Sequence, residues 1–274
     1  MKKKLFLVYI LIIYRLLVLS QNNNINSFGA RSTAMANTSV TLIDACSINN
    51  NQAGLGFINN STIIIHHENK YYIKGLSFNS IAGIINIGSG SIGLKLNYLG
   101  FSYYNNIETG ISYGQSFGKY LSIGLQLNYL HTQIWQHYGN TDVIFSEIGI
   151  ITKPIKNLII GVHIYNPTMS NYNHTKYKEY IPTILKLGTS YNFNKLALLN
   201  VEIVKDIDYP FIFRTGIEFK LITNFVVRAG VSSNSSLINF GIGYKTKGFN
   251  IDVAFSYHSY LGYSPFITLY YNFK

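Results

Sequence analysis

The sequence predicts an all-β fold, a transmembrane antiparallel β-barrel of about 14 strands with a small N-terminal plug segment. Three observations lead to this prediction. Hydrophobic residues make up 47% of the 274-residue chain and charged residues only 12%, whereas soluble domains are about 25% charged. After residue 20 there is no run of about 18 apolar residues that would form a membrane-spanning helix. Instead, apolar and polar residues alternate with period two, which is typical of strands.

Residues 1–20 have the features of a secretory signal peptide. Three lysines precede an apolar stretch from Leu5 to Leu19, and Ser20 supplies a small residue at its end. A membrane anchor is the alternative, but the stretch is shorter than the roughly 20 residues that a span needs. Removing residues 1–20 removes four basic residues and no acids, so the formal net charge falls by four from +11, to +7. Much of the basicity therefore belongs to the export signal, and we expect no nucleic-acid partner.

Residues 61–274 carry the strand signal and are predicted to form the barrel. In 91–98, 121–129 and 249–257, apolar and aromatic residues occupy one face, and mainly Gly, Ser and Asn occupy the other. An even strand number and aromatic residues near the strand ends are typical of bacterial outer-membrane barrels. A soluble β-sandwich or lipocalin-like barrel is the alternative, and the scarcity of charge argues against it. The predicted strands begin near Ser61, Ser80, Ser91, Ile107, Tyr120, Asp142, Asn157, Pro182, Lys195, Phe211, Asn224, Leu237, Phe249 and Pro265.

Most predicted connections are short and rich in Gly, Asn and Ser, as turns require. The longer links, around 133–141, 166–181 and 205–210, are expected on the outer side, where barrel loops are longer. The final strand has an aromatic residue, Phe273, one position before the end of the sequence. Outer-membrane barrels commonly end in an aromatic residue that the barrel-assembly machinery reads. We therefore expect a location in the cell outer membrane, with outer-membrane lipid and the assembly machinery as partners.

Isolated charges occur on the polar face of the predicted strands. A Lys or Arg that faces lipid at mid-bilayer costs about 2–4 kcal/mol, so we expect these charges to face the lumen. There, opposite charges can pair with one another or with Arg31 and Asp44 of the plug. We favour a filled, cross-bridged interior over a selective solute pathway. The predicted lumen charges are Lys95, Glu108, Glu147, Lys186, Glu202, Arg214, Glu218, Arg228 and Asp252.

Residues 21–60 do not follow the strand rhythm and are predicted to form the plug. Asp44 is placed to cap a short helix over residues 45–52. The stretches Gly29–Met35, Asp44–Ala45 and Asn51–Leu55 resemble the start of the FadL-type barrels and of the PorV/PorQ proteins of Bacteroidetes. Those proteins begin "GAR-x-x-x-MG", pass an Asp-Ala step and reach "N-P-A-G-L". In this sequence Gln52 replaces the usual Pro, and Ala replaces the Gly after Met35.

The resemblance covers residues 26–55, and the strand count extends it loosely to the whole chain. It implies that the N-terminal segment folds inside the barrel, and the candidate plug residues are Gly29, Arg31, Asp44, Asn51 and Gly54. It also implies transport of a hydrophobic small molecule, or a surface function in type IX secretion with secretion-system proteins as partners. The chain is shorter than the fatty-acid transporters and lacks room for their long outer loops. A structural barrel without a pathway is the alternative.

Two enzyme-like motifs are predicted to have structural roles. Gly110–Gly114 matches G-x-S-x-G but lies within an alternating strand, whereas a nucleophile elbow needs a strand–turn–helix. Gly88–Gly93 matches G-x-G-x-x-G but precedes a strand rather than a helix, which predicts a hairpin turn. None of the histidines has a zinc-binding spacing. We therefore predict no enzyme, no cofactor and no metal site, with an outer-membrane hydrolase as the least favoured alternative.

Three further residues have expected positions. His163 and His258 share the parity of the lumen-facing residues and are candidates to pair with carboxylates. The single cysteine, Cys46, excludes an intrachain disulfide and is expected to be a buried thiol in the plug.

Overall fold

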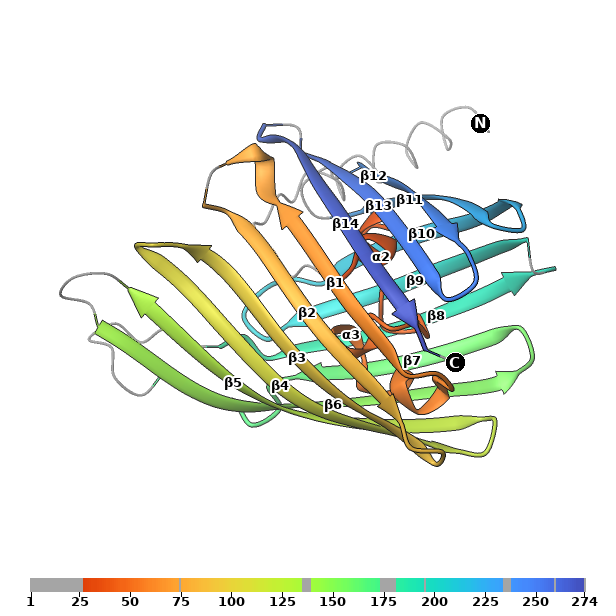
Figure 1. Cartoon of the computed structure of the whole chain (residues 1–274), viewed down its shortest axis with the longest axis horizontal. Coiled ribbons are helices and arrows are strands. Elements are labelled where there is room, and N and C mark those ends of the chain that lie inside the picture. The colour runs from red at the N-terminus through yellow and green to blue at the C-terminus, as the bar shows by residue number, and fades with distance from the viewer. Residues whose placement is uncertain are drawn as a thin grey trace, which may run out of the picture.

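The computed structural model describes residues 27–73, 75–134, 139–172, 181–194, 196–233, 238–258 and 260–273. Within these residues, fourteen antiparallel strands form a closed barrel (Figure 1). Each strand pairs with its neighbours in the sequence, and β1 pairs with β14 to close the wall. The predicted signal peptide and the start of the predicted plug lie outside the described residues. No helix in the described part of the chain has the length and apolar character needed to cross a membrane.

The predicted fold class is confirmed, and each of the fourteen predicted strand starts lies within three residues of an observed one. The strands are β1 (Thr62–Asn69), β2 (Ser77–Asn86), β3 (Gly90–Phe101), β4 (Tyr104–Phe117), β5 (Leu121–Ile134), β6 (Gly139–Ile155), β7 (Leu158–Tyr165), β8 (Ile184–Phe193), β9 (Ala197–Asp206), β10 (Ile212–Ile222), β11 (Phe225–Ser232), β12 (Ile238–Lys245), β13 (Phe249–His258) and β14 (Gly262–Asn272).

The two faces of the wall differ as the alternation predicts. In β5, the inward side chains of Gln126 and Asn128 are buried, whereas the outward Leu125 and Leu127 are 54% and 53% exposed. Closure of the barrel leaves no strand edge unpaired, so the backbone groups of the wall find partners within it. An apolar exterior around a polar interior is the arrangement that a hydrocarbon environment favours.

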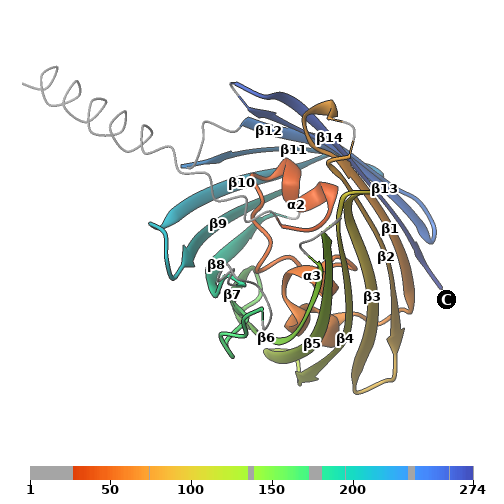
Figure 2. The same ribbon diagram turned by 90° about the vertical axis from the view of Figure 1, so that its left-hand side faces the viewer.

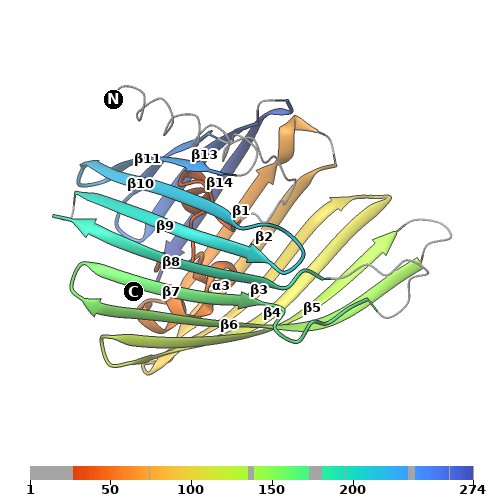
Figure 3. The same ribbon diagram turned by 180° about the vertical axis from the view of Figure 1, so that it is seen from behind.

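The antiparallel topology places the connections at two rims. The connections after β1, β3, β5, β7, β9, β11 and β13 lie at one end, which we call the loop rim. The strand ends that flank the predicted longer links, around 133–141, 166–181 and 205–210, lie at this rim, although residues 135–138 and 173–180 of these links lie outside the described residues. The alternate connections are short turns at the opposite end, the turn rim, and Gly88 and Gly118 adopt positive φ there. The wall formed by β3–β6 has the longest strands, and the back view shows β7–β11 on the other side (Figure 3).

Residues 27–60, which we call the inner segment, lie inside the barrel (Figure 2). They contain α2 (Ala30–Ala34), α3 (Ser47–Asn50) and the 3₁₀ helix η1 (Gln52–Phe57). Apolar side chains of the segment, including Ile48 and Leu55, pack against inward residues of the wall such as Ile64 and Ile84. The polar interior is therefore interrupted by an apolar patch where the inner segment meets β1 and β2.

The prediction of a helix over 45–52 capped by Asp44 was wrong in both extent and cap. The helix α3 is only four residues long, and its N-cap position is Cys46, without a side-chain cap. The Asp44 carboxylate instead accepts a hydrogen bond from the backbone N–H of Cys46 at 2.8 Å and pairs with Arg31. Asn51 then turns to an extended conformation (φ −164°), which ends the helix and starts η1.

Candidate functional site

All nine predicted lumen charges lie on inward-facing positions of the wall. Eight of them are buried, and Glu108 is partly buried. They form three groups, on β10–β13, on β3–β7 and on β8–β10. Each group contacts the inner segment or lines the lumen cavity that is described below. Eight of the nine charges are therefore bridged to other groups, and Lys186 is the one without an ion pair or hydrogen bond among the described residues.

The first group begins on α2 with Arg31. Its guanidinium forms a bidentate pair with Glu218 of β10, with Nε–Oε2 at 2.7 Å and Nη2–Oε1 at 2.9 Å. Its remaining nitrogen, Nη1, donates to Asp44 Oδ2 at 2.9 Å. Burial disfavours the charged form of Arg31, but the two carboxylates outweigh it and raise the pKa of the guanidinium well above its usual value. Arg31 therefore stays charged and ties two parts of the inner segment to the wall.

The same group continues across the wall. Arg228 of β11 donates to Glu218 at 2.7 Å and to Asp252 of β13 at 2.6 Å. Tyr270 of β14 donates its hydroxyl to the other oxygen of Asp252 at 2.6 Å. Because β12 lies between β11 and β13, the guanidinium of Arg228 crosses β12 at Gly243, where a Cβ atom would overlap both partners. A continuous ladder of charge-assisted hydrogen bonds thus joins α2 to four strands.

The second group centres on Glu147 of β6. One carboxylate oxygen accepts from the amides of Gln126 and Asn128 at 2.8 and 2.7 Å. The other oxygen contacts His163 Nε2 at 3.0 Å and accepts from Gln52 Nε2 of the inner segment at 3.1 Å. This buried carboxylate is therefore fully satisfied by hydrogen bonds.

Lys95 of β3 joins the same group. Its ammonium lies 2.5 Å from Glu108 of β4 and 3.6 Å from Glu147. Gly110 of β4 leaves space for the Lys95 side chain, whose Cε and Cγ atoms occupy the position that a Cβ atom would need. The ammonium therefore has two counter-charges within 4 Å.

The third group joins Glu202 of β9 to the inner segment and to Arg214 of β10. Its Oε2 atom accepts from the backbone N–H groups of Ser39 and Val40 at 2.6 and 2.8 Å. Its other oxygen lies 3.7 Å from Arg214, which also donates to the carbonyl of Asn37 at 3.2 Å. This carboxylate and guanidinium hold the loop between α2 and α3 against the wall.

The candidate plug residues mostly shape the backbone of the inner segment. Gly29 precedes α2 with φ +97°, a conformation that favours glycine. Asn51 donates to the carbonyl of Val40 at 2.7 Å and accepts from Ala53 N–H at 3.2 Å. Gly54 packs against Ser47, leaving no room for a Cβ atom.

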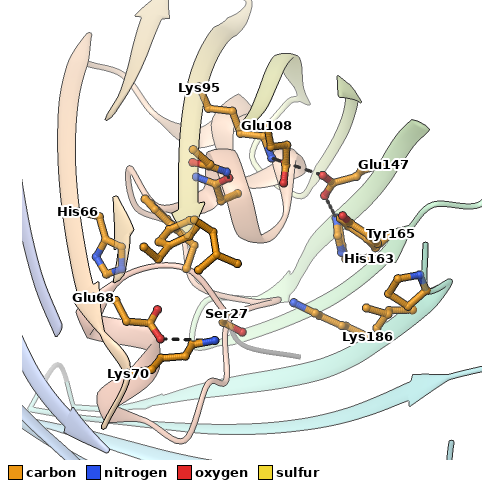
Figure 4. A pocket seen from close by; sticks show the side chains of 17 residues that line it. Ser27, His66, Glu68, Lys70, Lys95, Glu108, Glu147, His163, Tyr165 and Lys186 are labelled. Carbon is orange, nitrogen blue, oxygen red and sulfur yellow. Dashed lines mark hydrogen bonds and ion pairs between the residues drawn. The ribbon is translucent and has the colours of Figure 1, made fainter. Parts of the chain in front are cut away.

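A cavity of about 370 Å³ lies between the inner segment and the loop rim (Figure 4). Its lining comes from β1–β4, β6–β8 and the inner segment, and combines charged and aromatic side chains. Lys95, Glu108 and Glu147 face it from one side, and Lys186 faces it from β8. The inner segment contributes Ser27, Phe28 and Asn49 and forms its floor.

The smaller sequence predictions have mixed outcomes. His163 contacts a carboxylate, whereas His258 lies at the loop rim, where its Nδ1 atom faces the N–H groups of Tyr260 and Leu261. Cys46 is a buried free thiol, and burial raises its pKa. Gly88 lies in the turn between β2 and β3, as predicted.

The G-x-S-x-G motif lies within β4. Its serine, Ser112, is buried in the wall and donates to the carbonyl of Gly93 at 3.3 Å. Within the described residues, no three His, Cys, Asp or Glu side chains gather closely enough to hold a metal ion.

Several site residues were missed by the sequence analysis. The alternation of β5 predicts that Gln126 and Asn128 face inward, but no pattern in the sequence indicates that they bind a carboxylate. Gln52 and Tyr270 carry no local signal, because their roles depend on how the inner segment and the strands meet. The partners of Glu202 are backbone N–H groups, which every residue except Pro has, so the sequence gives no signal for them either.

No protein-family model matches the sequence, and no curated protein matches it. Solved structures of similar fold include the toluene transporter TbuX of Ralstonia pickettii, which is 12% identical with a TM-score of 0.69 over 92% of this chain and 100% of that chain. The toluene transporter TodX of Pseudomonas putida is 12% identical, with a TM-score of 0.68 over 91% and 99%. A FadL homologue of Pseudomonas aeruginosa is 12% identical, with a TM-score of 0.60 over 91% and 98%.

At this identity the likeness concerns the fold. The chain has the fold of FadL-family outer-membrane barrels, with a closed 14-strand wall and an apolar exterior within its described residues. Such a barrel is an outer-membrane protein, because its exterior suits lipid and its polar groups face inward.

Proposed function

We propose that this chain is a passive uptake channel of the outer membrane. A small molecule enters at the loop rim, binds in the lumen cavity and leaves when the inner segment shifts. The observation that carries this proposal is the cavity of about 370 Å³, which lies inside the barrel with the inner segment as its floor. A binding site for small molecules is a concave, largely pre-formed space of this order of size.

The contacts of the inner segment support a gating role. Its polar attachments to the wall include those made by Arg31, by Gln52 and by the N–H groups that bind Glu202. Further hydrogen bonds join it to other strands, as between Ala30 and Thr268 and between Ala53 and Ser122. Such contacts can be broken and remade together, as an ordered element that switches between two arrangements requires. The names of the similar structures, two toluene transporters and a FadL homologue, are consistent with transport.

Solute flux into proteoliposomes tests the proposal. The purified barrel would be reconstituted, and the entry of toluene, benzamide and benzoate would be measured against vesicles that contain heat-denatured protein. We expect the folded barrel to raise the entry of at least one probe. Absence of flux for all three, together with co-purification of secretion-system proteins from native membranes, would instead support the PorV/PorQ-type role in type IX secretion that the N-terminal motif implies. Absence of both would favour a structural barrel without a pathway.

A further inference from the structure

We propose that the lumen cavity selects a small organic anion and that Lys186 binds its carboxylate. This inference rests on the proposed uptake function and specifies its substrate class. The residue is 6% exposed on β8 and points into the cavity (Figure 4). Among the described residues, its ammonium has no hydrogen-bond or ion-pair partner, unlike the paired Lys95 on the neighbouring part of the lining.

The carboxylates around Lys186 have other partners. Glu202, on the adjacent strand β9, accepts two backbone N–H groups through one oxygen, and its other oxygen lies 3.7 Å from Arg214 without a hydrogen bond. Glu147 has contacts from Gln126, Asn128, His163 and Gln52, as described above. A buried ammonium without a counter-charge is costly, so the site favours a ligand that brings a negative charge.

A second polar group in the cavity is also unsatisfied. Asn49 of the inner segment accepts a hydrogen bond from Asn97 at 3.0 Å, and its own amide nitrogen is buried without a partner. Both residues line the cavity. The amide nitrogen is a donor, and a carboxylate or other polar acceptor on the ligand would satisfy it. The floor thus offers a hydrogen bond in addition to the charge of Lys186.

The opposite wall of the cavity sets the orientation of such a ligand. The strand β1 lies seven strands from β8 in either direction around the barrel, and it contributes Glu68 to the lining. Glu68 is buried, and its nearest cation, Lys70, is 3.8 Å away. The carboxylate of Glu68 repels an anionic group, and Lys186 attracts it. The negative end of the ligand is therefore expected at the β8 side.

Apolar and aromatic side chains provide a place for the rest of the ligand. Phe28 and Phe78 lie on the β1–β2 side, and Tyr165 and Ile184 lie beside Lys186. The cavity volume is near the lower end of the range for pockets that bind drug-sized molecules, about 300–1,000 Å³, so the ligand is compact. An uncharged hydrocarbon would leave Lys186 without a counter-charge, which separates this cavity from one built for toluene.

Three probes of similar size and different charge test this inference: benzoate, benzamide and toluene. Binding to the purified barrel in detergent would be measured by calorimetry for the wild type and for Lys186→Met. We expect benzoate to bind at least tenfold more tightly than benzamide. The Lys186→Met variant should lose at least tenfold in benzoate affinity, with little change for benzamide. Lys186→Arg, which keeps the charge, should retain most of the benzoate affinity.

Lys247→Met is the matched control, because Lys247 is exposed in the turn between β12 and β13, away from the cavity. Heat-modifiable migration on gels would confirm that each variant is folded. Equal affinity of the wild type for benzoate and benzamide, or unchanged benzoate affinity in folded Lys186→Met, would overturn the inference. Flux of benzamide or toluene without charge selectivity would leave the uptake function standing and overturn only the anion site. Absence of flux for every probe would overturn the uptake function itself.

Discussion

Gln52 shows how a departure from a motif acquires a role in the folded chain. The resembling motif has Pro at this position, and the preceding residue, Asn51, has the extended conformation (φ −164°, ψ 102°) that residues before Pro prefer. The backbone is therefore compatible with Pro, while the Gln side chain donates to Glu147 at 3.1 Å. The substitution adds a tether between the inner segment and β6 without changing the path of the chain.

Replacing Gln52 by Pro is expected to preserve the fold and to weaken this tether. A hydrogen bond to a charged group contributes about 1.5–3 kcal/mol, so the free energy of unfolding should fall by about that amount. Urea titration of the reconstituted barrel, followed by the shift from folded to unfolded migration on gels, measures this loss. Gln52→Leu is the control, since it removes the amide without Pro. A much larger loss in Gln52→Pro than in Gln52→Leu would contradict the claim that the backbone accepts Pro.

Arg31 attaches α2 to the wall through buried ion pairs. Arg31→Met removes the bidentate pair with Glu218 and the contact to Asp44. Removing one partner of a buried ion pair costs about 3–5 kcal/mol, so the free energy of unfolding should fall markedly in urea titrations. The exposed Lys119 supplies a control, and Lys119→Met should leave stability within about 0.5 kcal/mol of the wild type. Equal stability of the two variants would show that the ladder does not hold α2.

For individual residues, the sequence predicted which charges face inward but not which groups they contact. Parity along a strand is local, so Arg228 and Asp252 could both be assigned to the lumen from their neighbours alone. Their contact spans an intervening strand at Gly243 and depends on the register of β11, β12 and β13. No local pattern contains that register. The same holds for Lys186, which forms no ion pair with a described carboxylate, a fact that depends on how β8 and β9 meet the inner segment.

Among the elements, the inner segment meets the wall most closely at glycines. Gly124 of β5 faces the backbone at Gln52 and Ala53, and Gly230 of β11 faces Met35, with no space for a side chain at either position. The wall and the inner segment are therefore fitted backbone to backbone. The alternation predicts only that Gly124 lies on the polar face of its strand, because close approach by another segment leaves no mark in the sequence pattern.

A side chain at Gly124 is expected to displace the inner segment while the barrel still closes. In Gly124→Leu, the new side chain would occupy the place of the Gln52–Ala53 backbone. Trypsin should then cleave after Arg31, which is protected in the wild type by its burial against Glu218. Gly83→Leu is the matched control, since nothing lies within 4 Å of a Cβ atom at Gly83. Cleavage at Arg31 that is equally slow in both variants would contradict the fitted arrangement.

The helix α3 shows a feature of the inner segment that the sequence did not predict correctly. The residue type and position of Asp44 predict a helix cap. In the structure its carboxylate serves Arg31 and the N–H of Cys46, so the chain makes a turn before a four-residue helix. A helix this short is stabilised by its surroundings rather than by its own propensity. Its ends could therefore not be read from the residues within it.

For the whole molecule, the composition has a simple physical explanation. Many large hydrophobic side chains are exposed on the outer face of the wall, and the charges at inward positions of the strands lie in the lumen, where most of them pair across strands. Period-two alternation predicted the strand count, the strand starts and the direction of the polar face. It could do so because each of the fourteen strands of the barrel has the same alternation of outward apolar and inward polar residues. The cavity could not be predicted, since it is the space that the inner segment leaves unfilled.

The central claim is that the inner segment gates a pathway through the barrel. The most direct measurement compares benzoate flux into proteoliposomes containing the wild type, Gly124→Leu and Gly83→Leu, with trypsin cleavage after Arg31 reporting the position of the inner segment. We predict slow flux in the wild type and in Gly83→Leu, and flux at least tenfold faster in Gly124→Leu. Unchanged flux in Gly124→Leu, when trypsin shows that the inner segment has moved, would contradict the claim.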